Sequence, residues 1–238
     1  MGIAKSYRVA DARGMEATQT PLSGTETVLV GVVVSIVLVP SATWQLVQHF
    51  QVMAHEGMHG VVGSLSGRTV EYIELKSDAG GETRVVPTSG PGYLVAGFAG
   101  YLGPSAFGLG AARLIQYGHI IAALWVGMFL LGLLLIMLKR SFGCVTVPLA
   151  GLLIFLVLKH TSQTAEILAA YVITWFLLLS GVRIIVQRGV NSGDAGLLRD
   201  RTSIPRLVWL ALWLAGTLTA VVIGARWMLH PAVHPPAS

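Results

Sequence analysis

The sequence predicts an all-α polytopic membrane protein: a bundle of about six to seven transmembrane helices with one small β-hairpin at its surface. The chain of 238 residues is 54% hydrophobic and only 11% charged, whereas about a quarter of the residues in a soluble domain are charged. Apolar runs of about 20 residues, the length that crosses a bilayer, follow one another along almost the whole chain.

The first two apolar runs lie on either side of Pro40. A polar leader, residues 1–25, precedes the run VLVGVVVSIVLVP, which begins at Val28. A signal peptide with VPSA as its cleavage region is an alternative interpretation of this run, but the length of the leader and its acidic residues favour a retained span. Ser41 is suited to cap a second helix, which continues to about Ser66.

A strand pattern follows the second helix. TVEYIEL and ETRVV, within residues 68–90, alternate around the turn SDAGG and predict a hairpin at the membrane surface. We expect one domain over residues 26–230 and a tail over residues 231–238, with seven crossings if every run spans the membrane. The remaining apolar runs predict spans at about residues 91–116, 119–138, 144–158, 164–186 and 206–229.

The positions of lysine and arginine predict the orientation, because these residues stay on the cytosolic side of a membrane. With a cytosolic N-terminus and seven crossings, all but three of the 16 lie inside; the exceptions are Arg113, Lys159 and Arg226. The basic residues are scattered over short loops, so the net charge of +5 does not indicate a nucleic-acid partner. We expect a multi-pass protein whose composition is compatible with a bacterial plasma membrane.

Three polar residues inside the second run form a metal-binding pattern. In VMAHEGMHGVV, His55 and His59 are four residues apart, so on a helix both imidazoles reach one metal ion. With Glu56 beside them they form H-E-x-x-H, in which the histidines bind Zn²⁺ and the glutamate takes a proton from the attacking water. Each ionisable group inside a bilayer costs at least about 2 to 3 kcal/mol, which favours a metal site over ordinary core histidines.

A catalytic zinc site needs a third protein ligand. The predicted topology ends the motif helix at the cytosolic side, which disfavours the acidic and histidine side chains of the opposite side. His49 turns to a different face of the helix. Asp194, among small residues in GVNSGDAGLLRDRTSIP, is the preferred ligand; Asp200 has the character of a solvated surface charge, and the single cysteine, Cys144, that of a packing residue.

Four segments, AHEGMHGVVGSLSGRTVEYIEL, GGETRVV, AGYLGPSAFG and SGDAGLLRDRTSIPRLVWLALW, together resemble the site-2 protease group of intramembrane zinc metallopeptidases, specifically the B-like branch of peptidase family M-fifty. The resemblance implies a zinc ion held by His55, His59 and Asp194, with Glu56 as the catalytic base. It also implies hydrolysis of membrane-tethered proteins near the cytosolic face. The sequence departs from better-studied members because Ala195 follows the aspartate in a polar loop, and because it has no recognisable PDZ-like insert.

Two segments are candidates for substrate binding. Gly92, Ala96, Gly100 and Gly103 give one span a face of small residues, which allows another helix to approach closely. Pro104 removes a backbone donor and frees a carbonyl. This segment therefore either packs as an ordinary helix or uses the freed carbonyl to bind an unwound substrate. The hairpin is either a plain surface feature or a template that adds a strand to an extended peptide.

A non-catalytic metal-binding scaffold or transporter is the alternative function. Such a protein needs the three ligands but has no use for a base. Glu56 therefore distinguishes the two functions.

Overall fold

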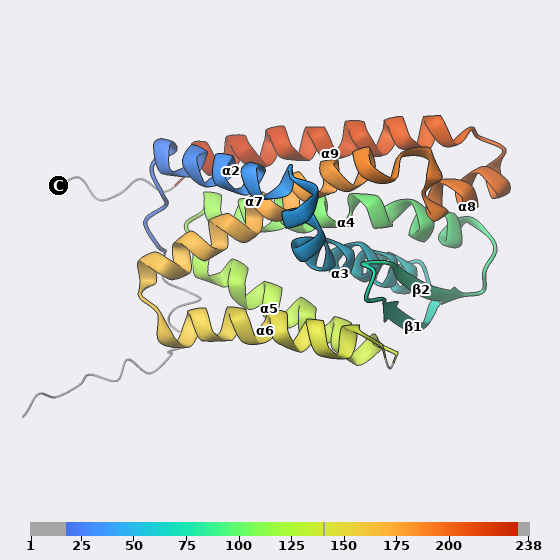
Figure 1. Cartoon of the computed structure of the whole chain (residues 1–238), viewed down its shortest axis with the longest axis horizontal. Helices are drawn as coiled ribbons and strands as arrows, with labels where there is room; N and C mark the ends of the chain where they lie inside the picture. The colour runs from blue at the N-terminus through green and yellow to red at the C-terminus, as the bar shows by residue number, and fades with distance from the viewer. Residues whose placement is uncertain (1–17, 140, 233–238) are drawn as a thin grey trace, which may run out of the picture.

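The computed structural model describes residues 18–139 and 141–232. These residues form a helical bundle with a two-stranded antiparallel sheet (Figure 1), so the predicted fold class is confirmed. The elements are α2 (Gly24–Leu38), α3 (Ser41–Leu65), β1 (Thr69–Leu75), β2 (Gly81–Val86), α4 (Pro91–Gln116), α5 (Ile120–Met137), α6 (Gly143–His160), α7 (Gln163–Arg188), the 3-10 helix η1 (Gly189–Asn191), α8 (Gly193–Thr202) and α9 (Arg206–Leu229).

The first two helices begin in different ways. A capping box starts α2: the side chain of Ser23 accepts from the amide of Glu26, and the Glu26 carboxylate accepts from the amide of Ser23. Pro40 occupies the N-cap position of α3 without a side-chain hydrogen bond. The prediction that Ser41 caps this helix is therefore wrong, because Ser41 is already its first residue.

Helices α2 and α3 meet at Pro40 and bend by 107°. Within the described residues, five helices are long and apolar enough to cross a membrane (α4, α5, α6, α7 and α9), and the bent pair makes a sixth if it is one broken span. The described residues therefore provide five to six candidate spans, fewer than the seven expected if every apolar run crossed the membrane. The 15 residues of α2 extend only about 22 Å, less than the ~30 Å of a hydrocarbon core, and α3 carries the polar motif.

Both ends of the described chain lie at the turn between α4 and α5. The amide of Gln19 donates to the carbonyl of Gly118 at 2.7 Å, and the amide of Ala232 donates to the carbonyl of Gln116 at 2.8 Å. The hairpin and α8 lie at the opposite end of the bundle (Figure 1). This arrangement corresponds to an even number of crossings in place of the odd number that we expected.

The basic residues remain unevenly distributed over these two ends. Lys5, Arg8, Arg13 and Arg140 lie outside the described residues. Of the described ones, Arg113, Lys159 and Arg226 lie near the α4–α5 end, and the hairpin end has Arg68, Lys76, Arg84, Lys139, Arg183, Arg188, Arg199, Arg201 and Arg206. The positive-inside rule still favours a cytosolic hairpin end.

The hairpin forms where the sequence predicts it. Its register pairs Ile73 with Thr83, and a bulge lies between Val70 and Tyr72. On its outer side β1 contacts the end of α5: the amide of Lys139 donates to the carbonyl of Ile73 at 2.8 Å. No strand of the described chain pairs with the other edge of β2.

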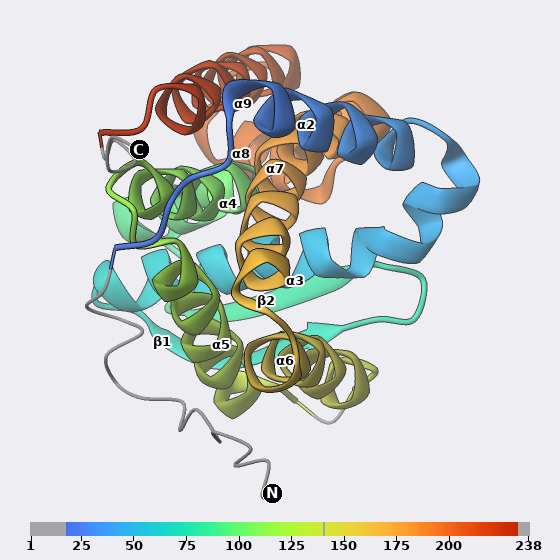
Figure 2. The same cartoon turned by 90° about the vertical axis from the view of Figure 1, so that its left-hand side faces the viewer.

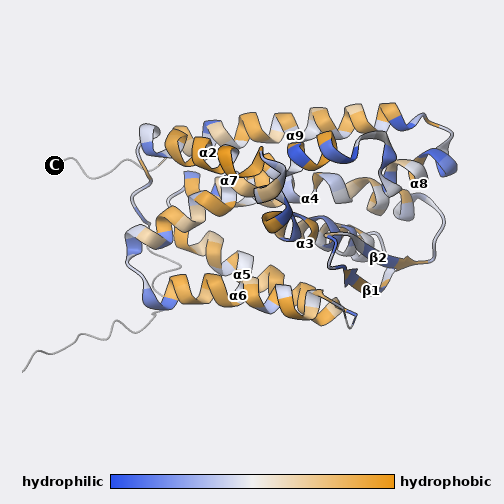
Figure 3. Cartoon of the chain, viewed as in Figure 1, coloured by the Kyte–Doolittle hydropathy of each residue, from blue (hydrophilic) through white to orange (hydrophobic). Residues whose placement is uncertain are grey.

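Helix α4 lies at the centre of the bundle, against α3, α7 and α9. Viewed end-on, α5 and α6 lie on one side of the molecule and α2 and α9 on the other (Figure 2). Hydrophobic residues predominate in the long helices, whereas hydrophilic residues gather at the hairpin, α8 and the turns (Figure 3). Many of the large apolar side chains of these helices are exposed. This distribution is typical of a bundle surrounded by lipid, with both ends in water.

Candidate metal centre

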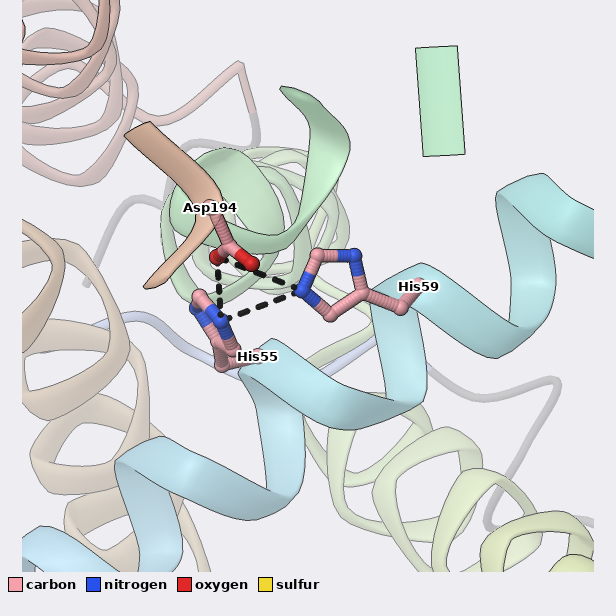
Figure 4. Close-up of side chains that lie close together, drawn as sticks. All are labelled: His55, His59 and Asp194. Carbon is pink, nitrogen blue, oxygen red and sulfur yellow. Dashed lines mark hydrogen bonds and ion pairs between the residues drawn. The ribbon is translucent and has the colours of Figure 1, made fainter. Parts of the chain in front are cut away.

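His55, His59 and Asp194 lie together, although the aspartate is 135 residues beyond the second histidine in the chain (Figure 4). The Oδ2 atom of Asp194 is 3.1 Å from Nε2 of His55 and 3.5 Å from Nε2 of His59. The two Nε2 atoms are 3.1 Å apart. Ligand atoms about 2.05 Å from a tetrahedral zinc ion are about 3.3 Å from each other, so the three side chains match the spacing that zinc requires.

The main chain of α4 orients the second histidine. Nδ1 of His59 lies 2.7 Å from the carbonyl oxygen of Ala96. Because a carbonyl only accepts, Nδ1 is the donor of this hydrogen bond, and the bond directs Nε2 toward Asp194 and His55. A hydrogen bond of this kind is the usual partner of a metal-binding imidazole.

Asp194 lies in the first turn of α8 rather than in the polar loop that we expected. The side chain of Ser192 caps this helix by accepting from the amide of Ala195 at 3.1 Å. Burial disfavours the ionised form of Asp194, but the adjacent imidazoles of His59 and His55 outweigh this and hold the pKa of its carboxyl well below its usual value. The group is therefore an anion, as a metal ligand must be.

Glu56 is buried, and β2 holds its carboxylate. The hydroxyl of Thr83 lies 2.7 Å from Oε2 of Glu56 and 3.0 Å from the Glu56 carbonyl oxygen. A Cβ atom built on Gly81 would overlap the same carboxylate, so the hairpin approaches it closely only because this residue is glycine. Glu56 stands beside the three clustered side chains and is not one of them.

The small residues of α4 allow it to lie against the motif helix. A Cβ atom on Gly100 would overlap His59 and lie 2.9 Å from Cε1 of His55, and one on Gly103 would lie 2.7 Å from the carbonyl oxygen of Ala54. The small-residue face expected from the sequence therefore lies against the part of α3 that carries His55 and His59. The helix is continuous through Pro104.

An open cleft of about 460 Å³ leads to the cluster between β2, α4 and the start of α8. Its walls include Glu56 and His59 of α3, Thr83 of β2, Gly97 of α4 and Asp194 of α8. Consecutive residues of β2 therefore line the same cleft as His59 and Asp194.

The other candidates for a third ligand lie elsewhere. Cys144 is exposed, and its Sγ contacts the carbonyl of Lys139 at 3.7 Å. Asp200 pairs with its neighbour Arg199 on the surface, at 3.0 Å. The ring of His49 packs against Phe142 with centroids 5.2 Å apart.

Two residues of the site were not singled out from the sequence, Thr83 and Tyr101. In the sequence, Thr83 has no feature that distinguishes it from other strand residues. Its contact with Glu56 exists only because the hairpin packs on α3. Tyr101 is in the quoted segment AGYLGPSAFG, and its ring lies edge-on to that of His55 with centroids 4.7 Å apart.

Comparison with known proteins gives one match. The family model described as Peptidase M50B-like matches residues 28–224, which include the motif helix, the hairpin and α8. No curated protein and no solved structure matches the chain.

Proposed function

We propose, from the premise that the chain belongs to the Peptidase M50B-like family, that it is a zinc-dependent endopeptidase of the site-2 protease type. Its substrates are membrane-tethered proteins, which it cleaves near the face of the membrane that holds the hairpin. The observation that carries this proposal is the cluster of His55, His59 and Asp194 beside a separately held carboxylate, that of Glu56.

In this proposal the two histidines and Asp194 hold the ion, and Glu56 works next to it. When bound, zinc makes water a nucleophile at neutral pH and polarises a substrate carbonyl. Glu56 takes the proton of the attacking water and delivers it to the leaving amine. The hydrogen bond from Thr83 fixes one carboxylate oxygen, so the other is available for the water.

The free edge of β2 is the proposed binding site for the substrate main chain. A peptide that has unwound from its helix adds to this edge as a third strand, because strand addition satisfies backbone groups without selecting a particular sequence. Gly81, Thr83 and Val85 of β2 line the cleft that His59 and Asp194 also line, which is why we place the added strand there.

A metal-binding scaffold or transporter remains the second candidate, since the same ligands bind an ion without hydrolysis. Two contacts favour the protease. The carboxylate of Glu56 is held by Thr83 of another element, and Glu56 lines an open cleft together with residues of β2. Neither feature contributes to holding an ion.

The test co-expresses the protein with a single-span reporter that carries a different epitope tag on each side of its span. Glu56→Gln is expected to retain zinc at the parental stoichiometry and to lose cleavage by at least about 100-fold, because the base is absent. Asp194→Ala is expected to lose both zinc and cleavage, because only two ligands remain.

Glu71→Gln is the matched control, since Glu71 lies on β1 and pairs with Arg84 at 2.7 Å on the surface. It is expected to keep zinc and activity. Cleavage that continues unchanged in Glu56→Gln would contradict the protease, and equal zinc content in the parent and Asp194→Ala would exclude Asp194 as a ligand.

A further inference from the structure

The motif helix α3 contacts different partners with its metal ligands and with its glutamate. The ring of His59 lies against α4, where its Nδ1 is 2.7 Å from the carbonyl oxygen of Ala96. Glu56, Gly60 and Gly63 follow one another at intervals of four and three residues, which places them in one stripe along the helix. This stripe lies against the hairpin. The side chains that would bind the ion and the side chain that would act as the base are therefore supported by separate elements.

Strand β2 contacts the glutamate through two residues of one face. Residues two apart in a strand point to the same side, and both Gly81 and Thr83 lie against the Glu56 side chain. The hydroxyl of Thr83 is 2.7 Å from Oε2 and 3.0 Å from the main-chain oxygen of Glu56. Gly81 lies against the other carboxylate oxygen, Oε1, which a Cβ atom at this position would overlap. The main chain and the side chain of Glu56 are thus held at one point of β2.

The hairpin fits closely onto the two glycines of the stripe, Gly60 and Gly63, which we call the glycine notch. A Cβ atom on Gly63 would lie 2.8 Å from Cγ1 of Val85, the next residue of the same face of β2. A Cβ atom on Gly60 would lie 3.1 Å from Cδ1 of Ile73, the residue of β1 that pairs with Thr83. The lack of side chains in the notch therefore determines how closely Thr83 approaches the base.

A helix does not by itself fix the carboxylate of a glutamate. The side chain has several rotatable bonds and loses rotamer freedom when it is held, whereas a general base must lie within hydrogen-bond reach of the proton that it takes. Glu56 is only 5% exposed, so its carboxylate depends on donors from the protein rather than on bulk water. Thr83 is such a donor, at a place set by the packing of the hairpin.

We propose that the hairpin is the positioning element for the catalytic base: the hydroxyl of Thr83 holds the Glu56 carboxylate in its working orientation, and the glycine notch sets the distance at which it does so. This inference rests on the proposed protease function and adds that base positioning is separable from metal binding. A misplacement of about 1 Å can lower a reaction rate by about 100-fold. Changes in the hairpin are therefore expected to reduce cleavage without releasing zinc.

The first test measures zinc content, and kcat and KM for the single-span reporter, on the full chain in detergent. Thr83→Val keeps the shape of the side chain and removes its hydroxyl. We expect kcat to fall about 10-fold to 100-fold, with parental KM, because the backbone edge of β2 is unaltered, and with parental zinc content. Thr83→Ser keeps a hydroxyl at this position and is expected to retain most of the parental kcat.

Thr69→Val is the matched control. Thr69 begins β1, and its side chain is exposed, so the substitution removes a hydroxyl from the same hairpin at a place away from the base. It is expected to keep parental kcat, KM and zinc content. This control separates the contact with Glu56 from a general effect of valine on the hairpin.

The second test moves the hairpin without changing Thr83 or the base. In Gly63→Ala the new Cβ atom would crowd Cγ1 of Val85, and we expect kcat to fall about 10-fold with parental zinc content. Adding Val85→Ala removes that Cγ1 atom, and the nearest remaining atom of residue 85 is its Cβ at 3.6 Å. The double variant is therefore expected to recover most of the kcat lost in Gly63→Ala, a coupling that a double-mutant cycle measures.

Parental kcat in Thr83→Val, an equal loss in Thr69→Val, or a loss of zinc in parallel with activity would overturn the positioning role and leave the proposed function intact. A double variant less active than Gly63→Ala would overturn the role of the notch. Unchanged cleavage by Glu56→Gln would instead overturn the proposed function, and this inference with it. Loss of kcat with zinc retained in Thr83→Val and Gly63→Ala, and recovery in Thr83→Ser and in the double variant, supports the proposal.

Discussion

Helices α4 and α5 follow each other in the chain and are both apolar enough to cross a membrane, but their surroundings are opposite. Over its apolar 18-residue stretch, α4 has a mean hydropathy of 1.3, and 39% of this stretch is buried. The corresponding stretch of α5 has a mean hydropathy of 2.7, and only 17% of it is buried. The less hydrophobic helix is the more buried one. In α5, large side chains such as Phe129 and Ile136 are 65% and 81% exposed.

The difference follows from the solvent. Lipid tails are as apolar as leucine, so moving a large apolar side chain from lipid to the inside of a bundle gains no hydrophobic free energy. Close packing and hydrogen bonds decide instead which helix is central. Helix α4 has Gly100 and Gly103 where it meets α3, and the carbonyl of Ala96 where it meets His59. Small residues, rather than hydrophobicity, mark the helix that supports the site.

The two helices are expected to differ most when one methyl group is added to each. In Gly100→Ala, the new Cβ atom would overlap the imidazole of His59, so we expect zinc affinity to fall by about 100-fold or more. Gly132→Ala in α5 is the matched control, because nothing lies within 4 Å of its added Cβ atom. Metal content and chelator competition measure both; similar affinities in the two variants would contradict the special role of α4.

A smaller effect is expected where α4 meets the backbone of α3 away from the imidazoles. In Gly103→Ala, the Cβ atom would lie 2.6 Å from Cβ of Met58 and 2.7 Å from the carbonyl oxygen of Ala54. Overpacking of this kind typically costs about 1 to 3 kcal/mol, and thermal unfolding in detergent measures it. Gly110→Ala has open space around its Cβ atom, so an equally large loss there would show that helix propensity, not close approach, governs α4.

The smallest effect is expected at the tryptophans of the two regions. Trp213→Phe removes the hydrogen bond to the carbonyl of Phe98 and is expected to lower stability by about 1 kcal/mol, measured by the same thermal unfolding. Trp125 of α5 is 37% exposed, and Trp125→Phe is expected to leave stability unchanged. Equal losses in the two variants would mean that α4 gains nothing particular from α9.

The prediction of the fold from the sequence succeeded where a local rule applies. Apolar runs predicted the long helices within a few residues, and alternation around SDAGG predicted the hairpin. The expectation of seven crossings counted α2 and α3 as separate spans, because local sequence patterns do not determine the angle between two helices. Pro40 signals the end of α2, but only the packed structure shows that α3 leaves at 107°. That angle changes which end of the bundle holds the start of the described chain.

The candidate site divides in the same way. The spacing of His55 and His59 follows from helix periodicity and is visible in four letters of sequence. Among several acidic residues, Asp194 was favoured by the small residues around it in the sequence and by a family resemblance. In the structure it is the one acidic side chain of the described residues that clusters with both imidazoles. Thr83 and Tyr101 had no local signature, since their contacts exist only after the hairpin and α4 pack on α3.

Hydropathy and helix periodicity are properties of neighbouring residues. The amino-acid sequence was therefore sufficient to predict a lipid environment, the positions of the long helices and the side chains that the site uses. The tertiary structure decided which aspartate approaches the histidines, what holds Glu56, and which of two apolar helices forms the centre. Those outcomes depend on distances between segments more than a hundred residues apart in the chain, and only close packing of the whole bundle sets such distances.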